Sequence, residues 1–365
     1  MEVNSKKEKL KSFLINETLI LTLLSIVMGL LVGALIITLS GYNPLEAYRL
    51  MLEGIFSQPR YIAWTVIRAT PLILTGLSVA FAFRTGLFNI GAEGQFIIGA
   101  LTAALLGYFL ELPAILHVPI VLCGSILAAA TWGGIVGFLK SKFGIHEVIA
   151  SIMLNWIALY FMNYIINQPG FKRPGTEASF DIHESARISI PWMREVLGPA
   201  TKVNWGIVIA LVITAVIYYL LFKTTIGYEL RAVGYNKDAA EYGGINVNRS
   251  IMLSMAIAGA LAGAAGAMHV MGVSFRVSVL AAMEGYGFNG IAVALIGNNN
   301  PFGVILSAFL FGGLTYGGSK MQTIGVPTEV INIVIGSIIF FVATYRIFRY
   351  VLVLFNRKKL QKEVQ

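Results

Sequence analysis

Several apolar stretches of this sequence contain an amide or carboxyl side chain, and these polar residues need an explanation. Asn89 and Glu93 stand four residues apart in the apolar stretch 88–110, and Phe96 follows them. Residues four apart share one face of a helix, so a helix there would carry these three together, with Gln95 pointing roughly the opposite way. An uncompensated polar group is costly in an apolar environment. We therefore expect Asn89, Glu93 and Phe96 to line a polar pathway or to hold a neighbouring helix.

Two of the ionisable residues also have structural interpretations. Glu93 would be structural if its carboxylate pairs with Arg68 or Arg84. His269 is the one histidine that falls in the middle of an apolar stretch. A hydrogen-bonded interior histidine is the first interpretation of that position, and a proton relay is the alternative.

Two short strings within the chain resemble each other. The string Phe288-Asn289-Gly290-Ile291 resembles Phe88-Asn89-Ile90-Gly91, which lies 200 residues earlier. Transporters are often built from repeated halves whose discontinuous helices lie at the substrate level. The two strings therefore indicate either an internal repeat or a chance match of four residues.

Motifs of the common catalytic and cofactor sites are missing. The sequence has no G-x-x-x-x-G-K-[ST] phosphate loop, no recognisable Ser-His-Asp set and no histidine cluster with metal-ligand spacing. The string from Gly285 to Gly290 fits G-x-G-x-x-G, but it lacks the strand and the acidic residue of a dinucleotide site. The single cysteine, Cys123, has no partner for an intrachain disulfide. We therefore expect a protein that is not an enzyme and holds no metal or cofactor itself.

The composition indicates which elements must position these residues. Hydrophobic residues make up 57% of the 365 positions and charged residues 12%, against about 45–50% and about 25% in soluble domains. An apolar stretch of about 20 residues spans the hydrocarbon core as a helix. The sequence therefore predicts an all-α polytopic membrane protein, one transmembrane domain over residues 1–365 with about ten spans. The expected spans are 17–40, 61–83, 88–110, 116–139, 147–167, 205–222, 251–271, 288–298, 302–322 and 329–355.

The charge distribution predicts how these spans are oriented. The net charge is +9, and an excess of Lys and Arg on cytoplasmic loops explains it without a nucleic acid partner. With ten spans both basic termini lie in the cytoplasm, which leaves 168–204 as a long external loop and 223–250 as a cytoplasmic loop. The stretch 288–298 is too short to cross a membrane alone. We expect it to begin near Glu284 or to be a broken helix.

The cytoplasmic loop 223–250 is too long for a simple helix connection, so it should contain structure of its own. Asn236 can cap a short helix, with Asp238 in its first turn and Gly243 or Gly244 at its end. A short polar helix at the membrane face, in a chain without a phosphate loop, is suited to docking a separate ATPase.

Small residues four positions apart recur within the expected spans and permit close helix approach. We interpret them as packing within one chain rather than as a dimer signal. The pairs are Gly29/Gly33, Gly133/Gly137, Gly259/Gly263 and Gly313/Gly317.

Three blocks of this sequence resemble a transporter family. The run from Arg84 to Gln95, the segment from Glu229 to Gly243 and the run from Gly287 to Leu295 are similar to signatures of permease subunits of ABC importers in the ribose, simple-sugar and branched-chain amino acid group. The blocks extend over most of the chain. The string His146-Glu147-Val148-Ile149 and the long external loop are most similar to the longer permease of bacterial nucleoside importers, guanosine importers included.

The resemblance implies a type II-like importer permease in the bacterial plasma membrane that works by alternating access. Its partners would be a second related permease, a cytoplasmic subunit that binds ATP and Mg²⁺, and an external lipoprotein that delivers a nucleoside. Nucleic acid is not among them. A nucleoside needs an aromatic surface for its base and polar partners for its ribose, so Phe288 and Asn289 are further expected pathway residues. The residues that would couple this chain to the ATPase are Arg231, Asn236, Asp238, Ala239, Ala240 and Gly243. We expect Ala240→Arg to abolish transport but not membrane insertion.

Two alternatives remain at this point. One is a permease of the same family for a simple sugar or an amino acid, since the binding lipoprotein sets most of the selectivity. The other is a secondary transporter driven by protons or sodium ions, for which Glu93 and His269 would be the buried ionisable groups. A docking helix in loop 223–250 argues against the second.

Overall fold

The computed structural model describes residues 24–344, which fall into two compact units. One unit is residues 58–313, and the other combines residues 24–57 with residues 314–344. The described residues form helices and three isolated β-bridges, with no strand of a sheet. The all-α prediction is thereby confirmed, while one permease domain over the whole chain stays a prediction.

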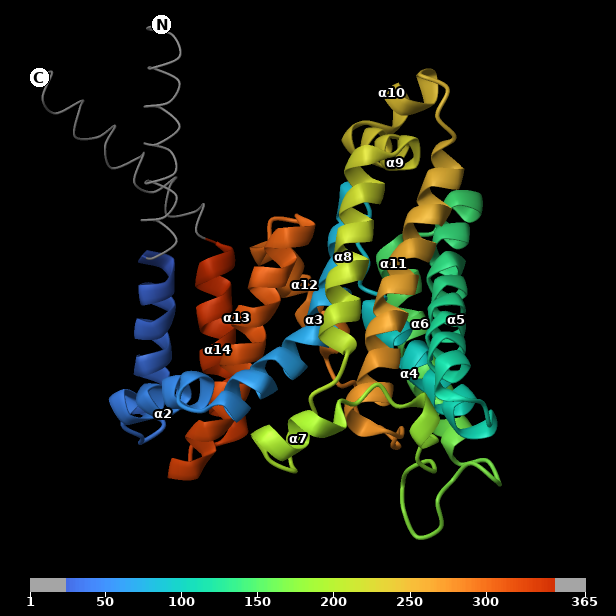
Figure 1. Ribbon diagram of the computed structural model, residues 1–365. Coiled ribbons are helices and arrows are strands. Elements are labelled where there is room, and N and C mark those ends of the chain that lie inside the picture. Colours follow the sequence, from blue (N-terminus) through green and yellow to red (C-terminus); the bar gives the residue numbers. More distant parts are fainter. Residues whose placement is uncertain (1–23, 345–365) are drawn as a thin grey trace, which may run out of the picture. The chain divides into compact units, whose positions relative to one another are not determined.

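The unit of residues 58–313 is a bundle of long apolar helices (Figure 1). One end of the bundle carries the two short helices α9 and α10, and the other carries the loop 168–204 with α7. Its helices are α3 (Pro59–Arg84), α4 (Ala92–Phe109), α5 (Ala114–Phe143), α6 (Glu147–Ile166), the 3₁₀ helix η1 (Glu184–Ala186), α7 (Pro191–Leu197), α8 (Gly206–Lys223), α9 (Thr225–Tyr235), α10 (Lys237–Tyr242), α11 (Val247–His269), the π-helical η2 (Val270–Ser274), α12 (Tyr286–Ile296) and the first part of α13 (Pro301–Lys320).

Helix α11 lies at the centre of this bundle and packs against α3, α4 and α5. Its contact with α5 depends on facing glycines, because a Cβ on Gly259 would overlap the backbone of Ala129 and one on Gly133 would overlap the backbone of Met255. Side chains at these positions would force the helix axes apart. The glycine pairs Gly133/Gly137 and Gly259/Gly263 are therefore used for packing within the chain, as predicted.

The second unit contains an apolar helix over Leu24–Leu39, the end of α13 and three further elements, which are α2 (Pro44–Phe56), the 3₁₀ helix η3 (Met321–Ile324) and α14 (Thr328–Ala343). Helix α2 was not among the elements expected from the sequence. The Asn43 side chain caps it by accepting a hydrogen bond from the backbone N–H of Leu45, and a proline occupies its first turn. Gly29 lies against the backbone of Ile338, so the first and last described helices pack closely.

Seven of the described helices are long and apolar enough to cross a membrane. Three shorter apolar helices, over Leu24–Leu39, Tyr286–Ile296 and Thr328–Ala343, occupy the remaining expected spans. Every expected span thus corresponds to a helix where it is described, whereas the count of ten stays a prediction. Residues 17–23 and 345–355 of the first and last spans lie outside the described residues.

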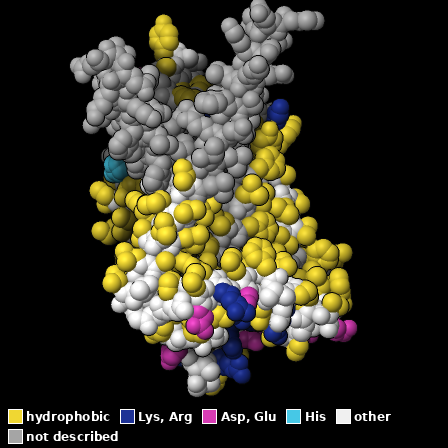
Figure 2. Space-filling model, turned by 90° about the vertical axis from the view of Figure 1, so that its left-hand side faces the viewer, with side chains coloured by type: hydrophobic (Ala, Val, Ile, Leu, Met, Phe, Trp, Pro, Cys, Tyr) yellow, Lys and Arg dark blue, Asp and Glu magenta, His cyan; other side chains and the backbone are white. Residues whose placement is uncertain are grey.

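The surface composition fits a lipid environment. Figure 2 shows hydrophobic side chains over most of the described part of one side face, with Lys, Arg, Asp and Glu gathered near its lower end. Large apolar side chains stand exposed on many helices, among them Leu31 at 58%, Ile115 at 82% and Tyr160 at 63%. Contiguous apolar surface of this kind is unfavourable in water and favourable in hydrocarbon. The chain is a multi-pass membrane protein.

Candidate substrate pathway and coupling segment

A break in the helical structure separates α11 from α12. After His269 the chain makes one π-helical turn, Val270–Ser274, and Phe275 then adopts a left-handed conformation with φ 61°. The extended segment that follows ends at Gly285, whose φ of 86° favours glycine and which precedes the first turn of α12. Single π turns and interrupted helices frequently mark functional sites in membrane proteins. The break therefore locates the candidate site.

Glu93 joins α4 to the start of α12. Its side chain is fully buried, and its two carboxylate oxygens accept hydrogen bonds from the backbone N–H groups of Gly285, at 2.7 Å, and Gly287, at 2.6 Å. The N-terminus of a helix favours a negative group in this position. A Cβ on Gly287 would overlap the backbone of Ala92 and Glu93, so only glycine permits the approach.

Glu93 therefore satisfies two helix-terminal donors, and the ion pairs among the described residues do not include it. The structural interpretation in which Glu93 pairs with Arg68 or Arg84 is wrong. The buried Nε of Arg68 has no hydrogen-bond partner, and Arg84 donates instead to the backbone oxygen of Asn299.

Asn89 does not lie on a helix with Glu93. Helix α4 begins at Ala92, and Asn89 belongs to the turn before it. Its side chain exchanges hydrogen bonds with the amide of Gln95 and donates to the hydroxyl of Ser78 at 2.9 Å. The prediction that Asn89 and Glu93 share a helix face, with Gln95 opposite, is wrong because the chain turns between residues 85 and 91. Whether Asn89 serves the pathway stays a prediction.

Three aromatic rings meet beside the break. The Phe96 ring stacks on that of Tyr286, with centroids 5.0 Å apart, and the His269 ring lies 5.1 Å from Tyr286 and 6.0 Å from Phe96. The rings come from α4, α11 and α12, so the cluster depends on the relative position of three helices. Only Phe96 was among the predicted pathway residues.

A cavity of about 70 Å³ adjoins this cluster. That volume holds a few ordered waters and is smaller than the roughly 300–1,000 Å³ of small-molecule sites. The side chains of Phe96 and His269 line it, as do Met162, Ser274, Arg276 and Glu284.

Two polar atoms at this cavity have no hydrogen-bond partner. They are Nδ1 of His269 and the hydroxyl oxygen of Ser274, both buried. A buried polar group without a partner is costly and rare, so water or a passing solute is the natural partner here. The expectation that His269 is a fully hydrogen-bonded interior histidine is therefore not met at Nδ1.

The other two predicted pathway residues lie within α12 and are not among the residues that line the cavity. Phe288 is 41% exposed on the outside of the helix bundle, and Asn289 is half-buried on the next position. The string that begins at Phe288 is helical, whereas the one that begins at Phe88 is a turn. The two strings thus occupy different local structures, and their role in the pathway stays a prediction.

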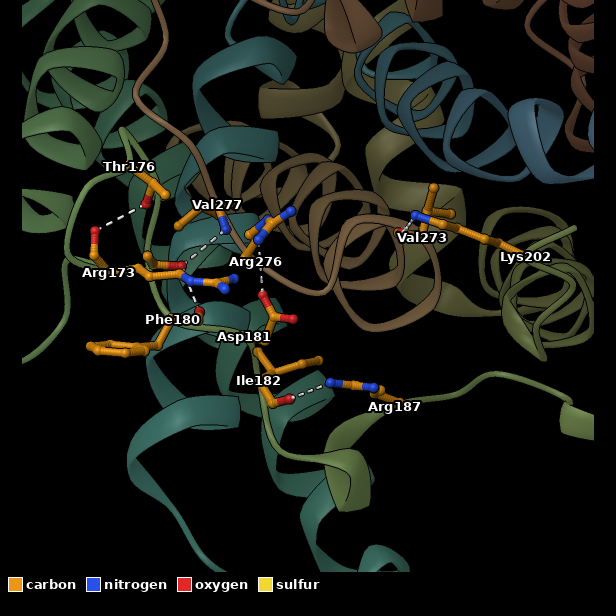
Figure 3. A network of polar contacts seen from close by, with 11 residues as sticks. Arg173, Thr176, Phe180, Asp181, Ile182, Arg187, Lys202, Val273, Arg276 and Val277 are labelled. Atoms are coloured by element: carbon orange, nitrogen blue, oxygen red, sulfur yellow. Dashed lines mark hydrogen bonds and ion pairs between the residues drawn. The ribbon is translucent and has the colours of Figure 1, made fainter. Parts of the chain in front are cut away.

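The loop 168–204 covers the segment that follows α11 (Figure 3). Main-chain hydrogen bonds join the two at several points. They are Ser179 N–H to Val277 O at 2.9 Å, Ile182 N–H to Phe275 O at 2.8 Å, Ile188 N–H to Met271 O at 3.1 Å and Val279 N–H to Glu177 O at 2.8 Å. The loop is therefore an ordered cover over the break and not a free linker.

Positive side chains reinforce this cover. Lys202 donates to the backbone oxygen of Val273 at 2.7 Å, Arg276 pairs with Asp181 at 3.4 Å, and both Arg187 and Lys202 lie against the Phe275 ring. Burial lowers the pKa of Lys202 below its usual value, and Arg194 and Arg276 lower it further.

The coupling segment has the local structure that the sequence predicts. The Asn236 side chain accepts a hydrogen bond from the Ala239 N–H at 3.0 Å and caps α10, with Asp238 in the first turn. Gly243 ends the helix, and Gly244 follows with φ 84°. These are the capping features read from the sequence, and they are confirmed.

The side chains of this segment divide into an outward and an inward set. Ala239 is exposed, and Tyr235 and Tyr242 are 87% and 97% exposed. Ala240 is buried against the chain at 6% exposure, and the guanidinium of Arg231 lies over the Phe222 ring at 5.3 Å. The exposed set can contact a partner, whereas Ala240 and Arg231 face their own chain.

Sequence reasoning missed Tyr286, Ser274 and Arg276. Tyr286 had one usable signal, since it sits between two glycines at the start of a short apolar stretch. Asn163 was also missed, although an amide within an expected span is itself a signal. Both ends of that amide bond to the backbone of Leu280, at 2.8 and 2.9 Å, and so fix the segment after the break.

Comparison with known protein families places these features in context. The family model described as the permease component of branched-chain amino acid transport systems matches residues 61–343. That range includes the break between α11 and α12, the loop 168–204 and the helices α9 and α10.

Several relatives match nearly end to end. The chain is 44% identical over 335 residues to the guanosine ABC transporter permease protein NupP of Bacillus subtilis, covering 92% of this chain and 95% of the relative. It is 37% identical to the nucleoside ABC transporter permease protein NupB of Lactococcus lactis, covering 88% and 89%. It is 30% identical to the glucose ABC transporter permease protein TsgB13 of Haloferax volcanii, covering 89% and 87%.

Weaker similarity extends to a second permease in two of these organisms. The chain is 27% identical over 256 residues to the guanosine permease protein NupQ of Bacillus subtilis and 29% identical over 269 residues to the nucleoside permease protein NupC of Lactococcus lactis. Each organism thus has two related permeases of which one is much more similar to this chain.

Proposed function

Because this chain belongs to the permease family of branched-chain amino acid transport systems, we propose that it is the transmembrane permease subunit of an ATP-driven nucleoside importer. The observation that carries the nucleoside assignment is 44% identity to a guanosine permease across 92% of the chain. The coarser statement, a permease subunit of an ABC transporter, follows from the family and the near full-length relatives.

The break between α11 and α12 is the proposed substrate pathway. A nucleoside presents an aromatic base and a hydroxylated sugar, so it needs ring surfaces and polar partners together. Phe96 and Tyr286 supply rings, and His269 and Ser274 supply polar atoms without partners of their own. Widening of the cavity from its present volume of about 70 Å³ would accompany passage of the substrate. Asn89, Phe288 and Asn289 are proposed to contribute in other conformations.

Helices α9 and α10 are the proposed contact with a separate ATPase subunit, which would bind ATP and Mg²⁺. Binding of ATP to that subunit would move the helices and shift the bundle between outward- and inward-facing forms. ATP must bind the two forms with different affinity for this to occur. The exposed Tyr235, Ala239 and Tyr242 support the contact, and the caps made by Asn236 and Gly243 hold the helix in place.

Two further partners complete the proposal. The paired permeases NupP and NupQ, and NupB and NupC, support a second related permease beside this chain. The loop 168–204 is proposed to receive nucleoside from an external binding lipoprotein. This arrangement places the chain in a bacterial plasma membrane with both termini in the cytoplasm.

Labelled guanosine uptake tests the proposal. Cells with and without this gene are compared, each with and without ATP depletion while the ion gradients are maintained. We expect gene-dependent uptake that is lost when ATP is depleted. Uptake that persists without ATP would instead favour an ion-coupled secondary transporter.

A simple sugar is the second candidate substrate, because the glucose permease of Haloferax volcanii matches 89% of the chain at 30% identity. Unlabelled glucose and adenosine are added as competitors in the same uptake measurement. Inhibition by adenosine but not by glucose supports the nucleoside assignment, and the reverse overturns it in favour of the sugar.

A further inference from the structure

A second cavity, larger than the one at the break, opens at the end of the bundle that carries α9. Its volume is about 400 Å³, which is in the range of small-molecule sites. The residues that line it come from the end of α3, the end of α8, helix α9 and the turn after α12. The lining residues include Arg84, Phe222, Arg231, Tyr235 and Asn299.

Two arginines face this cavity without a carboxylate partner. Each guanidinium uses its Nε on a backbone oxygen, Arg84 on Asn299 at 2.9 Å and Arg231 on Gly227 at 3.2 Å. Both lie over the ring of Phe222, at 5.6 and 5.3 Å from its centroid. The residues that line the cavity include no Asp or Glu, and the ion pairs of the described residues include neither arginine.

The charge of this pair is therefore not neutralised within the described chain. Two like charges gathered around one ring repel each other, and a partly desolvated position weakens screening by water. The outer nitrogens of each guanidinium remain available as forked donors. Such a fork matches the oxygens of a phosphate or a carboxylate in geometry as well as in charge.

The turn after α12 adds a third feature. Asn298 and Asn299 both adopt left-handed conformations, with φ of 53° and 51°, which is uncommon for residues other than glycine. The buried side-chain oxygen of Asn299 has no hydrogen-bond donor. A ligand that carries a hydroxyl or amino group beside its anion would supply that donor.

We propose that the cavity formed by α3, α8, α9 and the turn after α12 binds the phosphate group of an organic phosphate that also carries hydroxyl or amino donors. The phosphate bonds to Arg84 and Arg231, and the donor bonds to Asn299. Two sources offer this chemistry, a soluble nucleoside monophosphate and an anionic lipid head group. The exposed ring of Tyr235 at the rim provides a surface on which a base can stack.

A ligand bound to both arginines would link α9 to α3. Arg84 is the last residue of α3, and Arg231 lies in the middle of α9. The site is separate from the break between α11 and α12 and does not depend on which substrate is transported. On the orientation proposed above it opens to the cytoplasm.

Binding to the purified full-length chain, in a neutral detergent and without an ATPase, tests this inference. GMP is titrated by calorimetry in the presence of saturating guanosine, so that the transport pathway does not contribute. We expect saturable binding of GMP that inorganic phosphate displaces. Arg231→Gln should weaken it by roughly 10–100-fold, and Arg231→Lys, which keeps the charge but loses the fork, by less.

Arg249→Gln is the matched control, since Arg249 is an exposed arginine near the start of α11 and does not line the cavity. It should leave GMP binding unchanged. The lipid source is tested with the same variants in nanodiscs of phosphatidylcholine with or without phosphatidylglycerol, by counting the phosphatidylglycerol that each chain retains. Retention that falls with Arg231→Gln, without binding of GMP, assigns the site to a lipid head group.

Three results would overturn the inference. One is that neither GMP nor phosphatidylglycerol binding changes in Arg231→Gln. Another is that guanosine abolishes GMP binding, because the phosphate would then not be the recognised group. The third result comes from the unaltered chain, so it can be obtained even if Arg231→Gln does not fold. Raising salt from about 0.1 M to about 1 M shortens the screening length from about 10 Å to about 3 Å, so salt-independent GMP binding to the unaltered chain would exclude an arginine-held phosphate.

Discussion

Glu93 shows at the scale of a single residue how a buried carboxylate can be structural without an ion pair. It accepts hydrogen bonds from two backbone N–H groups at the start of α12. Glu93→Gln keeps the size but replaces one acceptor oxygen by an amide donor, so one N–H loses its partner. We expect the free energy of unfolding to fall by about 1–3 kcal/mol. Thermal unfolding of the purified chain in detergent measures this.

Glu53→Gln is the matched control for this substitution. Glu53 lies in α2, where its carboxylate bonds to Arg49 at the surface with both side chains largely exposed. Exposed ion pairs contribute about 0.2–1 kcal/mol, so the unfolding midpoint should change little. Equal losses for Glu93→Gln and Glu53→Gln would contradict the capping role.

The two alanines of α10 separate docking from folding. Ala239 is exposed and Ala240 is buried. We expect Ala239→Arg to abolish ATP-dependent uptake and to leave the unfolding midpoint unchanged, because the new side chain points at the partner. Ala240→Arg should abolish uptake too, but because the buried arginine disturbs the packing of the permease itself. We expect the free energy of unfolding to fall by about 1–3 kcal/mol from overpacking. Uptake and thermal unfolding are measured on both variants, and normal uptake in Ala239→Arg would exclude this face of α10 as the docking surface.

At the scale of elements, the contact between α5 and α11 depends on glycine. A Cβ on Gly259 would overlap the backbone of Ala129 in α5. We expect Gly259→Ala to destabilise the chain by about 1–3 kcal/mol, although alanine is the better helix former. Gly336→Ala is the control in α14, where a Cβ meets nothing within 4 Å, and it should stabilise by up to about 1 kcal/mol. Thermal unfolding of the two variants should therefore shift in opposite directions, and equal shifts would contradict the packing role.

Elements with a local cause could be predicted from the sequence. Apolar length predicted the long helices, and the cap and stop residues Asn236 and Gly243 predicted α10. The turn at Asn89 was not predicted, because the apolar stretch continues through it. Gly86, with φ 71°, is a local signal for the end of α3, but the hydrogen bonds of Asn89 to Ser78 and Gln95 leave no pattern in the sequence. Helix α2 is amphipathic and short, so a search for spanning lengths passes over it.

The candidate site was less predictable than the helices for a physical reason. The cluster of Phe96, His269 and Tyr286 brings together residues from three helices, and no local pattern encodes that meeting. The π turn at Val270–Ser274 has no distinctive composition either. Glu93 could be found because a carboxylate in an apolar stretch is expensive anywhere, but its partners are backbone groups that a sequence does not distinguish.

At the scale of the whole molecule, the distribution of charge predicts the orientation in the membrane. Both termini are rich in Lys and Arg, and such segments stay in the cytoplasm. Single cysteines at opposite ends of the bundle test this once Cys123 is replaced by serine. Glu184→Cys lies in the loop 168–204 at a position 92% exposed, and Glu241→Cys lies at an exposed position of α10.

A membrane-impermeant maleimide should label Glu184→Cys in intact cells and Glu241→Cys only after the cells are broken. The reason is that the two basic termini favour the cytoplasmic side, and with ten spans the loop 223–250 lies on the same side as both termini whereas the loop 168–204 lies on the other. The opposite labelling pattern would show that the chain has the inverted orientation in the membrane. The helices α9 and α10 would then face away from any ATP, and both the ATPase contact and a site for a cytoplasmic nucleotide would fail together. Labelling of both positions in intact cells would instead contradict the expectation that the single span α8, Gly206–Lys223, separates the two loops.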